Sequence, residues 1–118
     1  MQTIILLEDD YDIRELVKII LEEENYQVIA FSSIKEFSNR GKDIKADLFL
    51  LDVKLPDGSG IEVCEAIMSV EQTPIIIMSA HATLQTISKT CVPNDFIEKP
   101  FDIQSLTDRI RAQLPLEG

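Results

Sequence analysis

A short apolar run that ends at a single acid constrains the fold more than any other stretch of this chain. Residues 48–51 are apolar without interruption, and Asp52 ends the run. A turn-forming segment with one proline, one aspartate and two glycines follows at 56–60, and a helical pattern begins near Ile61. A strand that is buried on both faces has such an uninterrupted apolar sequence. The pattern predicts that Asp52 lies at the carboxyl end of a central parallel strand, where ligands bind in open α/β sheets.

Similar apolar runs alternate with helical patterns along the whole chain. Strands are predicted over Thr3–Leu7, Tyr26–Phe31, Asp47–Asp52, Pro74–Met78 and Asp95–Glu98. Helices are predicted from Asp10 or Asp12 to about Glu22, from Ser32 or Ser33 to about Arg40, from about Ile61 to before Thr73, weakly over Ala82–Lys89, and around Ile103–Leu114. This alternation indicates one α/β domain, a doubly wound five-stranded parallel sheet with helices on both faces. The flavodoxin-like strand order 2-1-3-4-5 suits the second strand, because Gln27 in its interior is typical of an edge.

Length and charge restrict the function classes. A chain of 118 residues is expected to form one domain, and we assign it to residues 1–114, with 115–118 as a tail, linker or cloning remnant. The net charge of −10 argues against direct nucleic acid binding by this domain, which needs a basic surface. No apolar run approaches the roughly 20 residues of a membrane span, and no secretory signal precedes the first strand. We therefore expect a cytoplasmic protein without a membrane partner.

The two cysteines show no pattern of a metal or redox motif. Cys64 and Cys91 are far apart in the sequence, without a CxxC spacing and without a histidine neighbour of metal-ligand type. Cys64 falls on the apolar face of the third predicted helix. Both are expected to be reduced.

Polar residues follow four of the five predicted strands. Because the strands are predicted to be parallel, these residues should meet at one edge of the sheet. Converging carboxylates favour a hard cation such as Mg²⁺, while an ammonium and a hydroxyl can bind the oxygens of an anion. Such a group suits phosphoryl transfer, and one carboxylate can itself form an aspartyl phosphate. The residues are Glu8, Asp9 and Asp10, then Asp52, then Ser79, then Lys99.

With these motifs in order, the chain resembles a response regulator receiver domain, the phosphoacceptor module of two-component signal transduction. The resemblance covers about Thr3 to Leu114. It rests on I-I-L-L-E-D-D, L-L-D-V-K-L-P-D-G-S-G, I-I-M-S-A-H and D-F-I-E-K-P-F. Each motif alone is weak, but the four together on the expected elements are specific.

The resemblance implies a phosphoacceptor and a metal site. Asp52 matches the phosphoacceptor of the family. Glu8 and Asp9 match the acidic pair that binds Mg²⁺ together with Asp52 and the backbone carbonyl of Lys54, with Mn²⁺ as a substitute ion. Asp10 would then cap the following helix.

It also implies a switch. Ser79 matches the hydroxyl that turns toward the phosphoryl group, Lys99 the lysine that contacts it, and Phe96 the switch aromatic. The Lys99-Pro100 peptide bond is usually cis in the family. Val92-Pro93 stands where the family often has Gly-Ala, which affects the weak helix at 82–89 and the surface that normally signals downstream.

The implied function is a phosphorylation-activated switch. A sensor histidine kinase or a histidine phosphotransfer protein donates the phosphoryl group. The surface formed by the helix at 82–89, the strand at 95–98 and the last helix then changes its contacts with a downstream effector domain or protein, or forms a homodimer. The domain would catalyse its own phosphorylation and dephosphorylation without being a turnover enzyme.

Alternative interpretations remain open from the sequence. Asp52 could be a plain helix cap, Lys99 a surface lysine and Phe96 ordinary core. A degenerate receiver would bind partners without phosphorylation. A Mg²⁺-dependent phosphatase that works through an aspartyl phosphate would need a second acid two residues after the nucleophile, where this chain has Lys54.

Overall fold

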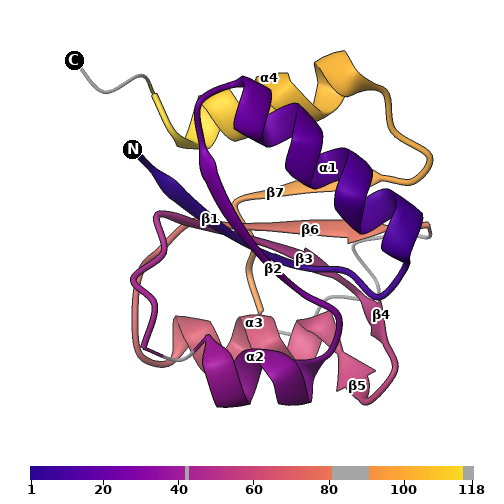
Figure 1. Cartoon of the computed structure of the whole chain (residues 1–118). Helices are drawn as coiled ribbons and strands as arrows, with labels where there is room; N and C mark the ends of the chain where they lie inside the picture. The colour runs from indigo at the N-terminus through magenta and orange to yellow at the C-terminus, as the bar shows by residue number, and fades with distance from the viewer. Residues whose placement is uncertain (42, 81–90, 116–118) are drawn as a thin grey trace.

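A five-stranded parallel sheet forms the centre of the molecule. The computed structural model describes residues 1–41, 43–80 and 91–115. The strand order is β2-β1-β3-β6-β7, and every neighbouring pair is parallel (Figure 1). This is the predicted doubly wound order, with the second strand at an edge. The strands are β1 (Thr3–Leu7), β2 (Gln27–Phe31), β3 (Leu48–Asp52), β6 (Ile75–Ser79) and β7 (Asp95–Glu98).

Among the described residues, four helices cover the two faces of the sheet. Figure 1 shows α1 (Tyr11–Glu23) and α4 (Ile103–Gln113) on one face, and α2 (Ile34–Arg40) and α3 (Gly60–Met68) on the other. Successive strand residues point to opposite faces, so each strand contributes to two cores. In β1, Ile4 packs with the α1 and α4 side, and Ile5 packs with the α2 and α3 side. Burial on both faces explains the uninterrupted apolar sequence of the central strands.

Side chains of the predicted type cap the helices. The sequence left Asp10 or Asp12 open for α1, and the structure has Asp10, whose carboxylate accepts a hydrogen bond from the Ile13 amide. Ser33 caps α2 and Asp102 caps α4 in the same way. Each cap accepts from an amide of the first turn that has no partner inside the helix.

Some local features differ from the prediction or extend it. A small antiparallel hairpin, β4 (Lys54–Leu55) and β5 (Gly58–Ser59), follows β3 where the sequence indicated only a loop. Two-residue strands are too short for an alternating hydrophobic pattern to be recognised in a sequence.

The predicted helix at 82–89 lies outside the described residues, as does most of the proposed tail at 115–118. None of the described helices is long and apolar enough to cross a membrane.

The expectation for the cysteines is wrong. Cys64 of α3 and Cys91, just before β7, are joined by a disulfide, and their Cα atoms are 5.5 Å apart. Both residues are fully buried. The sequence could not indicate this pairing, because the two residues meet only through the packing of α3 beneath the sheet.

Candidate functional site

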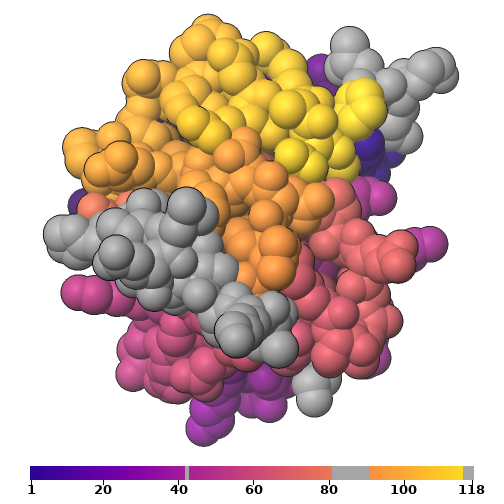
Figure 2. All heavy atoms as spheres, turned by 180° about the vertical axis from the view of Figure 1, so that it is seen from behind, coloured from indigo at the N-terminus to yellow at the C-terminus, as the bar shows by residue number. Residues whose placement is uncertain are grey.

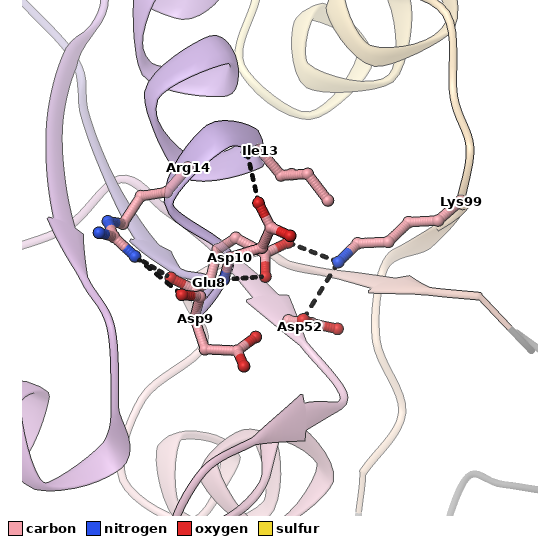
Figure 3. A network of polar contacts seen from close by, with 7 residues as sticks. All are labelled: Glu8, Asp9, Asp10, Ile13, Arg14, Asp52 and Lys99. Carbon is pink, nitrogen blue, oxygen red and sulfur yellow. Dashed lines mark hydrogen bonds and ion pairs between the residues drawn. The ribbon is translucent and has the colours of Figure 1, made fainter.

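The parallel sheet brings the predicted polar residues together at one edge. Glu8 and Asp9 follow β1, Asp52 ends β3, Ser79 ends β6, and Lys99 follows β7. Because all these strands run in the same direction, their carboxyl ends share this edge. Figure 3 shows the carboxylates of Glu8 and Asp52 with the Lys99 side chain reaching toward both.

Lys99 connects the two buried carboxylates. Its Nζ lies 2.5 Å from Glu8 Oε1 and 3.1 Å from Asp52 Oδ2 (Figure 3). Glu8 is fully buried and Asp52 nearly so, and the Lys99 side chain is only 16% exposed. Burial alone would lower the pKa of Lys99, but its hydrogen bonds to Glu8 and Asp52 raise that pKa above its ordinary value. The Lys99 side chain therefore remains protonated and positively charged.

The surroundings of Glu8 disfavour its ionised form. Burial, and then the neighbouring Asp52 carboxyl, raise the pKa of Glu8 to about 7, while Lys99 opposes this rise. A single ammonium thus compensates the two carboxylates only in part. The site favours additional positive charge.

The acidic residues also have the geometry of a metal site. Glu8, Asp9 and Asp52 each offer a carboxylate oxygen within 4.8 Å of the others. All the donors are oxygens, which is the donor set that Mg²⁺ prefers, and an exposed member such as Asp9 leaves room for water ligands. The residues present therefore fit a hard divalent cation.

The loop after β1 is fixed by its own neighbours. The Asp10 amide donates to Glu8 Oε2 at 3.2 Å. Arg14 Nη1 donates to the backbone carbonyls of Glu8 at 2.9 Å and Asp9 at 3.2 Å (Figure 3). Sequence reasoning missed Arg14, because a lone arginine in the first turns of an exposed helix gives no signal of what it contacts. It holds the backbone of the acidic pair in place.

The loop after β3 is fixed by close backbone contacts. The Val53 amide donates to the Met78 carbonyl at 3.2 Å, and the Gly60 amide donates to the Val53 carbonyl at 2.9 Å. A Cβ atom on Gly60 would collide with the carbonyl oxygen of Asp52, so this position requires glycine. Lys54 is exposed in β4, and the role of its carbonyl as a metal ligand stays a prediction.

The other predicted switch residues lie next to this group. Ser79 is almost buried, and its backbone carbonyl accepts from the Lys99 amide at 2.9 Å. Phe96 is half-buried in β7 and packs against the core on the α2 and α3 side. The Lys99-Pro100 bond is cis, as the resemblance implied. The roles of Ser79 and Phe96 stay predictions.

Comparison with known proteins agrees with this arrangement. The family model described as "Response regulator receiver domain" matches residues 4–111. Response regulator ArlR of Staphylococcus saprophyticus is 36% identical over 118 residues, which span 97% of this chain and 53% of that protein. Regulatory protein VanR of Enterococcus faecium is 33% identical over 113 residues, 94% of this chain and 49% of that protein. The chain thus spans about half the length of these curated relatives.

Solved structures show the same fold. The non-phosphorylated HemR receiver domain of Leptospira biflexa superposes with a TM-score of 0.89 at 30% identity, covering 100% of this chain and 98% of that one. The response regulator TrrA of Thermotoga maritima, in complex with Mg²⁺ and BeF, superposes with a TM-score of 0.87 at 26% identity, covering 97% of this chain and 100% of that one. The chain therefore belongs to the response regulator receiver domains, the phosphorylation-activated switches of two-component signalling.

Proposed function

We propose that Asp52 is the residue of this receiver that accepts the phosphoryl group. The donor is a phosphohistidine of a sensor histidine kinase or of a histidine phosphotransfer protein. An oxygen of Asp52 attacks phosphorus in line, the new O–P bond forms, and the P–N bond to the donor imidazole breaks. The observation that carries this proposal is the contact of Lys99 with both Asp52 and Glu8, because a positively charged side chain beside the Asp52 carboxylate supports a role for Asp52 in binding a phosphoryl group.

Glu8, Asp9 and Asp52, with the Lys54 carbonyl, would hold Mg²⁺, and Mn²⁺ could substitute for it. When bound, the ion would neutralise charge on the transferring phosphoryl group. Oxygen-only donors within 4.8 Å of one another support this assignment. Arg14 keeps the backbone of the acidic pair in position through its two carbonyl contacts.

Lys99 and Ser79 would bind the remaining phosphoryl oxygens. Lys99 would exchange part of its contact with Asp52 for the incoming anion, and the Ser79 hydroxyl would turn toward it. Phe96 would then rotate into the space left by Ser79. Strand pairing of β6 with β7 supports the coupling, because Ser79 lies opposite Glu98 and Phe96 lies opposite Ile77 in the same ladder.

The output would follow from a changed surface around β7 and α4. This surface would bind a downstream effector domain or protein, or a second copy of the chain. We propose that the domain acts in the cytoplasm as a switch that only phosphorylates and dephosphorylates itself, not as a turnover enzyme. Its net charge of −10 supports an output that does not involve direct contact of this domain with nucleic acid.

Binding of beryllofluoride, a mimic of the phosphoryl group, tests this proposal. We expect Mg²⁺-dependent shifts of the amide resonances of Asp52, Ser79 and Phe96 in the wild type, and no such shifts in Asp52→Asn. Asp47→Asn is the matched control, because the Asp47 carboxylate binds the Thr3 amide at the start of β1, far along the strands from the site. Equal shifts in Asp52→Asn would refute the assignment of Asp52. No shifts in the wild type would favour a receiver that binds partners without phosphorylation.

A further inference from the structure

The disulfide joins α3, which follows the Asp52 loop, to the segment that enters β7, which Lys99 follows. Cys64 and Cys91 are 27 residues apart in sequence, and the 5.5 Å between their Cα atoms lies within the range that a disulfide requires. Both are fully buried in the core on the α2 and α3 side. The bond therefore crosses the interior of the domain instead of closing a surface loop.

On one side, the bond holds the helix that follows the phosphoacceptor loop. Cys64 lies in the second turn of α3, which begins at Gly60. The Gly60 amide binds the carbonyl of Val53, the residue after Asp52. A restraint on α3 thus acts on the backbone next to Asp52.

On the other side, the bond holds the chain that enters β7. Three residues after Cys91, Asn94 binds Ile75 twice, through its amide at 2.8 Å and its side-chain carbonyl at 3.0 Å. Phe96 follows and packs against the same core as Cys91. Figure 2 shows orange atoms of the segment that includes β7 between the yellow atoms of α4 and pink atoms of the middle of the chain.

The sulfur of Met68 also connects α3 with the segment that enters β7. Met68 Sδ lies 4.0 Å from Cys64 Sγ and accepts a hydrogen bond from the Val92 amide at 3.3 Å. The contact of Met68 with the Val92 amide therefore joins the end of α3 to the segment before β7 in addition to the disulfide.

We propose that Cys64 and Cys91 form a reversible redox site, whose closure restrains α3 and β7 and thereby lowers the response of the domain to the phosphoryl group. Closure is thiol–disulfide exchange. Two thiols lose two protons and two electrons, the S–S bond forms, and a disulfide oxidant takes up these electrons and protons and is cleaved to two thiols. A dithiol reductant reverses each step through a mixed disulfide. Because both sulfurs are buried, exchange needs local opening and is slow.

The effect on the phosphoryl response rests on the proposed function, whereas the restraint does not. In reducing compartments, protein disulfides are usually transient and redox-sensing, which agrees with a site that opens and closes. The restraint should act on both elements that flank the bond. Because the proposed activation moves Phe96, the disulfide-bonded form would disfavour phosphorylation.

The first test measures the restraint without any phosphoryl group. The chain is incubated with a disulfide oxidant or with dithiothreitol, alkylated after unfolding, and weighed. We expect no alkylation in the oxidised form and two alkylated thiols in the reduced form. Amide hydrogen exchange of Gly60–Met68 and Asp95–Glu98 should be slower in the oxidised form, and Cys64→Ala should show no dependence on the redox reagent. Two free thiols under oxidising conditions, or equal exchange in both forms, would overturn the proposal.

The second test measures the coupling. The affinity for Mg²⁺ and beryllofluoride should be about fivefold lower in the oxidised than in the reduced wild type, as expected for a coupling of modest size. Cys64→Ala should bind equally under both conditions. Equal affinities in the two wild-type forms would overturn the coupling. Absence of binding in both forms would instead contradict the proposed function, while the hydrogen exchange result would still decide on the redox restraint.

Discussion

The ammonium of Lys99 lies 3.1 Å from Asp52 Oδ2 and 2.5 Å from Glu8 Oε1, so one cation is shared by carboxylates at the carboxyl ends of two different strands. These carboxylates carry one more negative charge than the lysine compensates when both are ionised. This excess of negative charge favours a divalent cation at the site, and the charge of that cation would in turn favour an anion beside it.

Removal of the Lys99 ammonium should destabilise the domain. In Lys99→Met, Glu8 and Asp52 lose their shared cation while they remain buried. Loss of one partner of a buried ion pair typically costs about 3 kcal/mol, and we expect a decrease of this order in the free energy of unfolding, measured by urea denaturation without metal. Mg²⁺ should restore part of the loss. Lys99→Arg, which keeps the charge, should lose less, and equal stability of wild type and Lys99→Met would contradict the account.

The stability of the metal-free domain should depend on the ionisation of Glu8. Its pKa is raised from 4.5 to about 7 in the fold, so between these values the folded state binds more protons than the unfolded state. The contribution of Glu8 to the free energy of unfolding should therefore fall as pH rises from 4.5 to about 7, and then stay constant. Thermal melts in a chelating buffer measure this slope.

Glu8→Gln should reduce that slope, because the amide does not titrate. Glu22→Gln, on the exposed face of α1, is the matched control and should keep the wild-type slope. An unchanged slope in Glu8→Gln would show that another group causes the pH dependence.

Gly60 should not tolerate a side chain. A Cβ atom there would collide with the Asp52 carbonyl, and the atoms that it meets belong to the backbone of Asp52 and Val53, which cannot move aside as a flexible side chain can. We expect Gly60→Ala to lose about 2 kcal/mol of folding free energy, as in overpacked cores, and to weaken Mg²⁺ binding through a displaced Asp52. Calorimetric titration with Mg²⁺ and chemical denaturation measure the two effects. Wild-type values for both would contradict the close approach of these backbones.

The carboxylate of Asp57 should stabilise α2 from the neighbouring loop. It accepts hydrogen bonds from the amides of Ile34 at 2.9 Å and Lys35 at 2.8 Å, and these bonds lower the pKa of Asp57 below its ordinary 3.8. Its contribution is thus complete above pH 3.8 and is lost as pH falls through the lowered pKa. Asp57→Ala should melt below the wild type at neutral pH, and the difference should shrink in acid. A constant difference would argue against an electrostatic contribution of Asp57.

The architecture could be predicted from the sequence, because its signals are local. Each central strand is buried on both faces, and its apolar run is visible without a structure. The convergence of Glu8, Asp52 and Lys99 then follows from parallel strands alone. The metal, switch and phosphoacceptor roles of the site residues stay predictions.

Contacts that depend on long-range packing could not be predicted in this way. The disulfide of Cys64 and Cys91 forms because both residues pack into the same core on the α2 and α3 side of the sheet, which no local pattern records. Arg14 is similar, since its guanidinium folds back onto the loop before its own helix. The two strands of the β4–β5 hairpin are too short for an alternating hydrophobic pattern to appear in the sequence.

Intact-protein mass spectrometry after incubation with acetyl phosphate tests the central claim most directly. We expect the addition of one phosphoryl group to the wild type and to Asp47→Asn in the presence of Mg²⁺, and none to either without the metal. Asp52→Asn should gain no phosphoryl group under any of these conditions. An unmodified wild type with Mg²⁺, or an equal gain in Asp52→Asn, would contradict the assignment of Asp52 as the phosphoacceptor.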